Sequence, residues 1–258
     1  MTALITGASS GIGLELAREF ASHRHDVILV ARSEEKLRAL ARELESNGVR
    51  ADVVAADLSS PSSPRTIVEA FASQGREIDV LVNNAGYGLF GRFLETPLAT
   101  ELDMIQVNIV ALTELTKRVL PGMIARKRGR ILNLASTAAF LPGPLMAVYY
   151  ATKAYVLSFS EAIATELEGT GVTVTALCPG PTASGFQAAA RLGQSKLVAG
   201  RKLPTAADIA RFGYEATMSG RAVAVPGLTN KLTAELHRVF PRSLVRKMVQ
   251  RVQEPRAS

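Results

Sequence analysis

A tyrosine and a lysine in the sequence YYATK have the spacing of an acid–base pair. Tyr149 and Lys153 lie four residues apart, so a helix, which we predict over residues 147–168, places them on one face. Tyr150 and Tyr155 point elsewhere, and for Tyr150 we expect a packing or interface role. An ammonium about 4 Å from a phenol, at an effective dielectric constant near 20, favours the phenolate by about 4 kcal/mol, or about three pKa units. Desolvation opposes this shift, and the balance suits a general acid–base near neutral pH.

A glycine-rich turn near the N-terminus has the composition of a phosphate-binding loop. The apolar run at residues 2–6 leads directly into TGASSGIG, which contains Gly7, Gly11 and Gly13. Glycines allow the backbone to turn tightly and to approach a pyrophosphate. The helix that begins near Gly11 would present free N–H groups to that pyrophosphate. The spacing is G-x-x-x-G-x-G, and its place after the first strand predicts a dinucleotide site.

Short apolar runs alternate with segments of helical spacing along the chain. Apolar strands that are each followed by a helix predict a parallel sheet covered on both faces, an α/β Rossmann-type doubly wound fold of about seven strands. We expect one catalytic domain over residues 1–227 and a C-terminal helical extension over 228–258. The irregular stretch 181–205 is a candidate lid over the site. The predicted strands are residues 2–6, 26–31, 51–57, 78–83, 130–135, 172–177 and 221–226.

Composition excludes several other classes of protein. Cys178 is the single cysteine, so no internal disulfide can form, and His23 and His25 have no companion ligand, so we expect no metal site. The uncharged stretches 131–152 and 170–190 are interrupted by proline and glycine, and the N-terminus lacks the pattern of a signal peptide. We therefore expect a cytoplasmic protein.

Most of the positive charge lies in the C-terminal extension. From Leu228 onwards, seven basic and two acidic residues contribute +5 of the net charge of +7. Basic residues that bind nucleic acid usually cover a face and alternate with aromatic residues, so we expect no nucleic-acid partner. The extension reads as an amphipathic helix broken at Pro241. We favour its packing on the domain or on a neighbouring subunit over contact with an anionic membrane.

Three motifs in this order resemble the short-chain dehydrogenase/reductase family: TGASSGIG, NNAG at 83–86, and Y-x-x-x-K at 149–153. The resemblance covers about residues 1–227. It implies reversible hydride transfer between a nicotinamide and a carbonyl or secondary alcohol, and a homodimer or homotetramer formed through helices near 101–126 and 147–168. It also implies four catalytic roles: Tyr149 as acid–base, Lys153 tuning it and binding the nicotinamide ribose, Ser136 holding the substrate oxygen, and Asn108 kinking a helix and holding a water that leads to the lysine.

The same resemblance implies the cofactor contacts. The glycine turn would hold the pyrophosphate, Asp57 the adenine, residues 84–86 the adenosine half, and Thr182 and Ser184 the nicotinamide carboxamide. Ser184 replaces the family's threonine but keeps the hydroxyl. Tyr149 and Lys153 belong to the cofactor set as well. The remaining residues in this set are Gly7, Ser9, Ser10, Gly11, Ile12, Gly13, Asn84, Ala85, Gly86, Pro179 and Gly180.

Arg32 indicates which dinucleotide binds. A carboxylate at the end of the second strand would bind the ribose 2′-hydroxyl of NAD, whereas this chain has Ala31 followed by Arg32, whose guanidinium suits a 2′-phosphate. Ser10 stands where some NADP-dependent relatives have a basic residue. We therefore favour NADP(H) over NAD(H) as cofactor.

Apolar residues near the expected cleft indicate a lipophilic substrate, with core packing as the alternative for each of them. We predict an NADP(H)-dependent carbonyl reductase or alcohol dehydrogenase. The alternative is a non-catalytic NADP(H)-binding regulator of the same fold. The candidate substrate residues are Tyr87, Phe90, Leu141, Leu145, Met146 and Phe186.

Overall fold

The fold is a single parallel sheet with helices on both faces, seen in a computed structural model that describes residues 1–186, 190, 203–239 and 241–253. Within this part of the chain the sheet has seven strands in the order β3-β2-β1-β4-β5-β6-β7. The direction of winding changes between β1 and β4, which is where doubly wound sheets bind ligands. The Rossmann-type prediction is confirmed. The strands are β1 (Thr2–Thr6), β2 (Asp26–Ala31), β3 (Ala51–Ala55), β4 (Val80–Asn83), β5 (Gly129–Leu134), β6 (Val172–Leu177) and β7 (Val223–Ala224).

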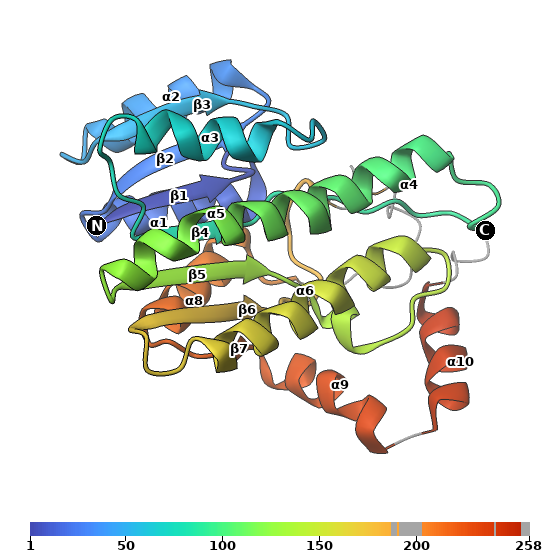
Figure 1. The fold of residues 1–258 in the computed structure, drawn as a ribbon. Helices are drawn as coiled ribbons and strands as arrows, with labels where there is room; N and C mark the ends of the chain where they lie inside the picture. Colours follow the sequence, from blue (N-terminus) through green and yellow to red (C-terminus); the bar gives the residue numbers. More distant parts are fainter. Residues whose placement is uncertain (187–189, 191–202, 240, 254–258) are drawn as a thin grey trace.

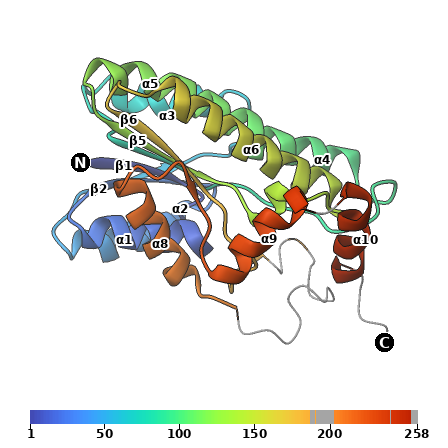
Figure 2. The ribbon, with the colours of Figure 1, turned by 90° about the horizontal axis from the view of Figure 1, so that it is seen from below.

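Helices cover both faces of the sheet (Figures 1 and 2). Two layers of apolar side chains hold them against it. Side chains alternate along each strand, so Ala3 and Ile5 of β1 enter one layer and Leu4 enters the other. One face carries α1 (Gly11–Ser22), α2 (Glu34–Glu45) and α8 (Ala206–Met218). The opposite face carries α3 (Ser63–Ala72), α5 (Leu112–Ala125) and α6 (Ala147–Glu166). The remaining elements are α4 (Leu98–Ile105), the π-helix η1 (Gln106–Ala111), the short helix η2 (Thr137–Phe140), α9 (Leu228–Val239) and α10 (Arg242–Gln253).

Some strands are shorter than predicted, for local reasons. β3 ends at Ala55, and Asp57 instead accepts a hydrogen bond of 2.9 Å from the Ser59 backbone N–H, which turns the chain. β7 keeps only Val223 and Ala224 because it lies at the sheet edge and pairs only with β6. Apolar runs set where strands exist, whereas turn hydrogen bonds and edge position set where they end.

A buried polar network joins the middle of the sheet to two helices. Asn83 on β4 donates through Nδ2 to Thr116 Oγ1 on α5 (3.0 Å) and to Asn133 Oδ1 on β5 (2.9 Å). Asn133 Nδ2 in turn donates to Ser160 Oγ on α6 (2.9 Å). Buried polar groups cost free energy unless they are paired, so these bonds favour one register between α6 and the ends of β4 and β5.

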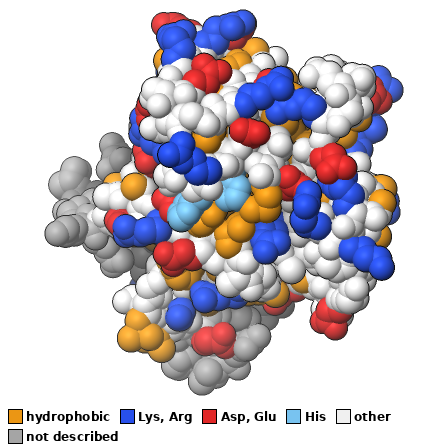
Figure 3. All heavy atoms as spheres, turned by 90° about the vertical axis from the view of Figure 1, so that its left-hand side faces the viewer, with side chains coloured by type: hydrophobic (Ala, Val, Ile, Leu, Met, Phe, Trp, Pro, Cys, Tyr) orange, Lys and Arg blue, Asp and Glu red, His pale blue; other side chains and the backbone are white. Residues whose placement is uncertain are grey.

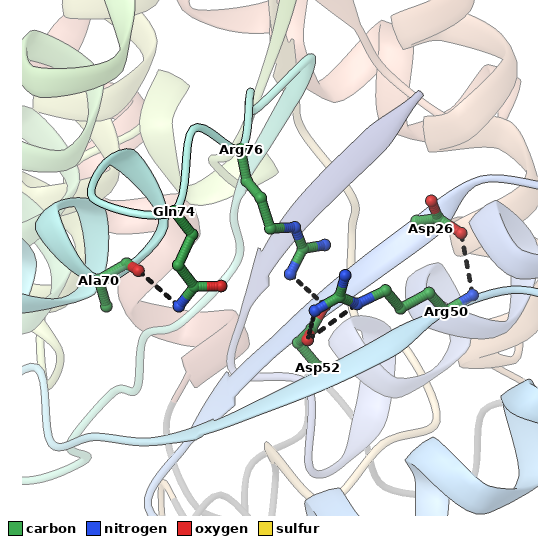
Figure 4. A network of polar contacts seen from close by, with 6 residues as sticks. All are labelled: Asp26, Arg50, Asp52, Ala70, Gln74 and Arg76. Atoms are coloured by element: carbon green, nitrogen blue, oxygen red, sulfur yellow. Dashed lines mark hydrogen bonds and ion pairs between the residues drawn. The ribbon is translucent and has the colours of Figure 1, made fainter.

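The face at the amino ends of the strands shows interspersed positive and negative side chains around two histidines (Figure 3). The histidines take part in packing: the His25 ring nitrogen Nε2 lies 3.0 Å from Tyr214 Oη, and the His23 ring stacks on Tyr214 at 4.2 Å. No cluster of three potential metal ligands occurs among the residues that the structure describes. At the outer edge of the sheet, Asp52 accepts from Arg50 at 3.0 Å and from Arg76 at 2.5 Å (Figure 4).

The chain beyond β6 is only partly described. Ala183 and Thr205 form a β-bridge, so the two ends of the predicted lid lie together, while residues 187–189 and 191–202 of that stretch fall outside the described residues. α9 and α10 lie at the end of the molecule where the strands have their carboxyl ends (Figure 1). Within the described ranges, no helix is long and apolar enough to cross a membrane.

Candidate active site

A cleft of about 1160 Å³ opens at the carboxyl ends of the strands. Most of the residues predicted for the site line this cleft. Segments from the whole length of the chain therefore meet at one surface. Gly13, Asn108, Phe90 and Leu145 do not line the cleft. The lining residues that the sequence predicted are Gly7, Ser9, Ser10, Gly11, Ile12, Arg32, Asp57, Asn84, Ala85, Gly86, Tyr87, Ser136, Leu141, Met146, Tyr149, Lys153, Pro179, Gly180, Thr182, Ser184 and Phe186.

The turn after β1 is packed so closely that only glycine fits it. Gly7 has φ +67°, and a Cβ there would lie 2.7 Å from Asn84 Nδ2. A Cβ on Gly13 would overlap the Gly7 carbonyl and the Asn84 amide. These contacts bring the start of α1 close to the NNAG segment at the end of β4.

The N-terminus of α1 suits an anion. Ser10 is the N-cap residue but makes no side-chain capping bond, and the first turn of α1 contains no acidic residue. Ser9, Ser10, Gly11 and Ile12 line the cleft at this point. Backbone N–H groups and the positive end of the helix dipole therefore face the place where a dinucleotide pyrophosphate would bind.

Two basic residues border the cleft after β2, and an acidic residue borders it after β3. Arg32, Ser33 and Lys36 line the cleft beside Asp57. The Ser59 backbone hydrogen bond and, to a smaller extent, the nearby charge of Arg32 lower the pKa of the Asp57 carboxyl. A carboxylate and a guanidinium thus share this end of the cleft, and a guanidinium is the group that can bind a phosphate in a bidentate manner.

Ser136, Tyr149 and Lys153 meet at the floor of the cleft. Ser136 caps η2 at the end of β5: its Oγ accepts a 3.1 Å bond from the Ala138 N–H and donates to the Pro179 carbonyl at 3.4 Å, and it lies near enough to the Tyr149 phenol to lower its pKa. Tyr149 and Lys153 lie on one face of α6, and the Lys153 ammonium is 5.9 Å from the centre of the Tyr149 ring. Both side chains are buried, with exposed fractions of 9% and 5%.

Burial is the main cause of the pKa shifts of Tyr149 and Lys153. Desolvation raises the pKa of the Tyr149 phenol well above its ordinary value, and the nearby Ser136 hydroxyl only partly opposes this. Desolvation also lowers the pKa of Lys153 to about 8. We expected the ammonium to outweigh desolvation at the phenol. That expectation is wrong for the protein alone, because Lys153 Nζ donates to the Leu134 carbonyl at 2.6 Å and burial of the phenol opposes its ionisation.

Asn108 lies behind the cleft, in the π-helical turn η1 between α4 and α5. Its Oδ1 accepts from the Tyr87 N–H at 3.1 Å, and its Nδ2 donates to the Tyr87 carbonyl and to Thr152 Oγ1, both at 3.0 Å. A Cβ on Gly86 would lie 2.8 Å from Asn108 Oδ1 and 3.6 Å from Lys153 Nζ. Asn108 therefore connects η1, α6 and the segment after β4, directly behind the lysine.

The loop after β6 closes the cleft near the glycine turn. A Cβ on Gly11 would lie 3.5 Å from the Ser184 Cβ. Thr182 Oγ1 donates to the Gly180 carbonyl at 2.9 Å, and Ser184 Oγ accepts from the Phe186 N–H at 3.4 Å. The predicted carboxamide-binding turn thus lies between α1 and the catalytic floor.

One end of the cleft is apolar. Met146, Tyr149, Tyr150 and Ala190 are buried together there, and Leu141 and Phe186 pack against them. The Tyr149 and Phe186 rings are 5.4 Å apart, and Tyr150 packs over Gly143, where a Cβ would overlap its ring. The Tyr87 hydroxyl instead donates to the Thr100 carbonyl on α4 at 3.1 Å.

Two groups of lining residues were missed from the sequence. Lys36 lies in the first turn of α2, four residues after Arg32, and this closeness in sequence could have indicated a second cation. The C-terminal helices supply the other group, because α9 and α10 fold back over the cleft. No motif marks that contact. These residues are Thr229, Asn230, Thr233, Val245, Met248 and Val249.

Comparisons with known proteins agree with this geometry. The short chain dehydrogenase family profile matches residues 1–195. A short chain dehydrogenase of Pseudocercospora fijiensis is 37% identical over 185 residues, which are 71% of this chain but only 60% of the relative. The NADP-dependent 3-hydroxy acid dehydrogenase YdfG of Salmonella typhi is 40% identical over 184 residues, 70% of this chain and 72% of the relative. A short-chain dehydrogenase from Sphingobium yanoikuyae, solved with NADPH, has a TM-score of 0.84 and 29% identity, covering 100% of this chain and 98% of its own.

The close packing of Gly13 yields a prediction about cofactor binding. Gly13→Ala should raise the dissociation constant of NADPH by roughly tenfold or more, since overpacking costs about 1–3 kcal/mol and would displace α1 from the glycine turn. Fluorescence titration with NADPH measures this. Gly122→Ala on α5 is the matched control, because its Cβ would meet only the flexible end of Arg126. Wild-type affinity in Gly13→Ala would contradict the packing argument.

Proposed function

The chain belongs to the short-chain dehydrogenase family, and we propose that it catalyses reversible hydride transfer between NADP(H) and the carbonyl or secondary alcohol of a lipophilic small molecule. One observation carries this proposal: Ser136, Tyr149 and Lys153 converge at the floor of a cleft that also contains the glycine turn. NADPH, when bound, supplies the hydride.

In the proposed mechanism, the protein orients the carbonyl and supplies the proton. The Ser136 hydroxyl holds the substrate oxygen, where negative charge develops during hydride transfer. Tyr149 is protonated at neutral pH because burial raises its pKa, so it can donate a proton to that oxygen. The Lys153 ammonium stabilises the phenolate that remains, and Asn108, which contacts Thr152 on α6, would hold a water through which the proton is replaced.

The preference for NADP(H) rests on Arg32 and Lys36. Both line the cleft near the end of β2, where the adenosine ribose would bind. The planar guanidinium of Arg32 is suited to a phosphate. The relative from Salmonella is named NADP-dependent, and the Sphingobium structure contains NADPH.

The residues that line the cleft support a lipophilic substrate that carries no carboxylate. Among the described lining residues, the cations are Arg32, Lys36 and Lys153. Arg32 and Lys36 lie where the adenosine would bind, and Lys153 stabilises the phenolate of Tyr149. A carboxylate on the substrate would therefore lack a partner beside the apolar cluster of Met146 and Phe186. This separates the proposed substrate from the 3-hydroxy acids in the name of the Salmonella relative.

We also propose a homo-oligomer that forms through the helices η1, α5 and α6. These helices leave large apolar side chains exposed on the outer face of the domain, at Val110 (41%), Ile124 (41%) and Tyr155 (37%). Exposed apolar groups of this kind favour contact between subunits.

The alternative is an NADP(H)-binding regulator without turnover. A binding protein needs the glycine turn and Arg32, but it has no need of the complete set of Asn108, Ser136, Tyr149 and Lys153. Burying the Lys153 ammonium works against its charged form, as its lowered pKa shows, and catalysis gives a reason for that cost.

Replacing the acid tests the proposed reaction. Tyr149→Phe should lower kcat for NADPH-dependent reduction of lipophilic ketones and aldehydes by about 10²–10⁴-fold, because general acid catalysis is lost. NADPH should still bind. Tyr155→Phe is the control, since this hydroxyl lies outside the cleft and bonds only Thr113 among the described contacts. NADPH binding by wild-type protein without turnover of any tested carbonyl would favour the regulator.

Removing the guanidinium tests the cofactor assignment. Arg32→Ala should lower kcat/KM for NADPH by roughly tenfold to a hundredfold and change that for NADH little, since a hydrogen bond to a charged group contributes about 1.5–3 kcal/mol. Steady-state rates with each cofactor measure this. Arg38→Ala on the following helix α2 is the control, because Arg38 is exposed and pairs with Glu34. A wild-type preference for NADH would overturn the assignment.

A further inference from the structure

We propose that α9 and α10 bind an anionic lipid surface through the faces that they do not use for packing on the domain. The sequence alone favoured packing on the domain as the role of this extension. The structure shows such packing, but it occupies only part of each helix. The proposal concerns binding alone and does not depend on the proposed reaction.

The inner faces of the two helices belong to the fold. Ala234 on α9 and Val245 on α10 are buried, with exposed fractions of 3% and 1%. Asn230 packs against Gly180 so closely that a Cβ on that glycine would overlap it, and Val249 packs on the apolar cluster around Met146. These contacts fix both helices against the cleft.

The outer faces expose large apolar side chains. Leu228 and Leu232 on α9 are 74% and 64% exposed, and Leu244 and Met248 on α10 are 44% and 41% exposed. Each pair is four residues apart and so lies on one side of its helix. A helix on the surface of a soluble domain usually has polar residues at such positions.

Cations flank the apolar side of α10. Lys247 and Arg251 are themselves four residues apart and, by helical geometry, lie next to the stripe formed by Leu244 and Met248. Both are exposed, as is Arg246. α10 contains no acidic residue, whereas α9 carries the exposed Glu235 on the same side as Leu228 and Leu232. We define the docking face as Leu228, Leu232, Leu244, Met248, Lys231, Glu235, Lys247 and Arg251, which together carry a net charge of +2.

An anionic bilayer can bind both the apolar and the basic side chains of the docking face. Leucine and methionine side chains can enter the boundary between headgroups and acyl chains, while lysine and arginine remain among anionic headgroups. A second copy of this face would bring the cations Lys231, Lys247 and Arg251 of each copy together with Glu235 as the acidic residue, and so would leave an excess of positive charge in the contact. A nucleic acid would neutralise the cations but leave the leucines in water.

The position of the docking face gives further support. The loop that precedes α4 exposes Phe93 (63%) and Leu94 (95%), and it lies at the same end of the molecule as α10 (Figures 1 and 2). Met248 and Val249 also line the cleft. A lipid surface bound here would therefore lie beside the wall of the apolar cleft.

Vesicle flotation of the full chain tests this inference. We expect binding to vesicles of phosphatidylcholine and phosphatidylserine in equal parts, weakening as salt is raised, and little binding to phosphatidylcholine alone. Lys247→Glu/Arg251→Glu should reduce the affinity roughly thirtyfold or more, since two favourable charges are lost and reversed. Leu232→Ser/Leu244→Ser should also weaken binding, and it should do so at high salt as well.

The controls separate lipid contact from a general effect of charge, from misfolding and from a change of oligomeric state. Arg42→Glu/Arg65→Glu makes the same change of charge at exposed positions on α2 and α3 and should bind vesicles as the wild type does. Circular dichroism and thermal melts check that each variant folds. Equal binding to both kinds of vesicle, no binding to either, or equal loss in the control would overturn the proposal. So would a leucine variant that only converts an oligomer to a monomer.

Discussion

The burial of Lys153 beside Tyr149 is the constraint on which the site depends. A buried ammonium needs a partner, and here that partner is the Leu134 carbonyl at the end of β5. The requirement fixes α6 against the sheet, because a shift of the helix would leave both groups unpaired. The network from Asn83 through Asn133 to Ser160 favours the same register further along α6.

The burial of Lys153 beside Tyr149 also explains the positions of several residues that would not touch the reacting atoms. Gly86 leaves room for Asn108 and Lys153, and Asn108 joins the Tyr87 backbone to Thr152 on α6. The π-helical turn at Gln106–Ala111 places this amide behind the lysine. Cys178 adds a neutral neighbour, because burial raises the pKa of its thiol to about 12. The groups around Tyr149 and Lys153 are therefore neutral, or are backbone groups that have hydrogen-bond partners. Burial is then the main influence on the pKa values of both residues.

Much of this arrangement was predictable from the sequence, since it rests on local patterns. Seven apolar runs predicted the sheet, and the glycine turn and the Tyr149–Lys153 spacing indicated residues that do line one cleft. The direction of the Tyr149 pKa shift was predicted wrongly, because spacing alone says nothing about burial or about the Leu134 carbonyl. The contribution of α9 and α10 to the cleft could not be predicted, because it depends on how a distant segment folds back.

The pH dependence of kcat/KM for NADPH during carbonyl reduction tests the role of the buried pair most directly, because this ratio reports groups in the free enzyme. Burial lowers the pKa of Lys153 to about 8, so the ammonium is present below that pH and is lost above it. With Tyr149 still protonated there, we predict a high value of kcat/KM at neutral pH that falls as the pH rises through about 8. A value that stays constant or increases through this range would contradict the role assigned to Lys153.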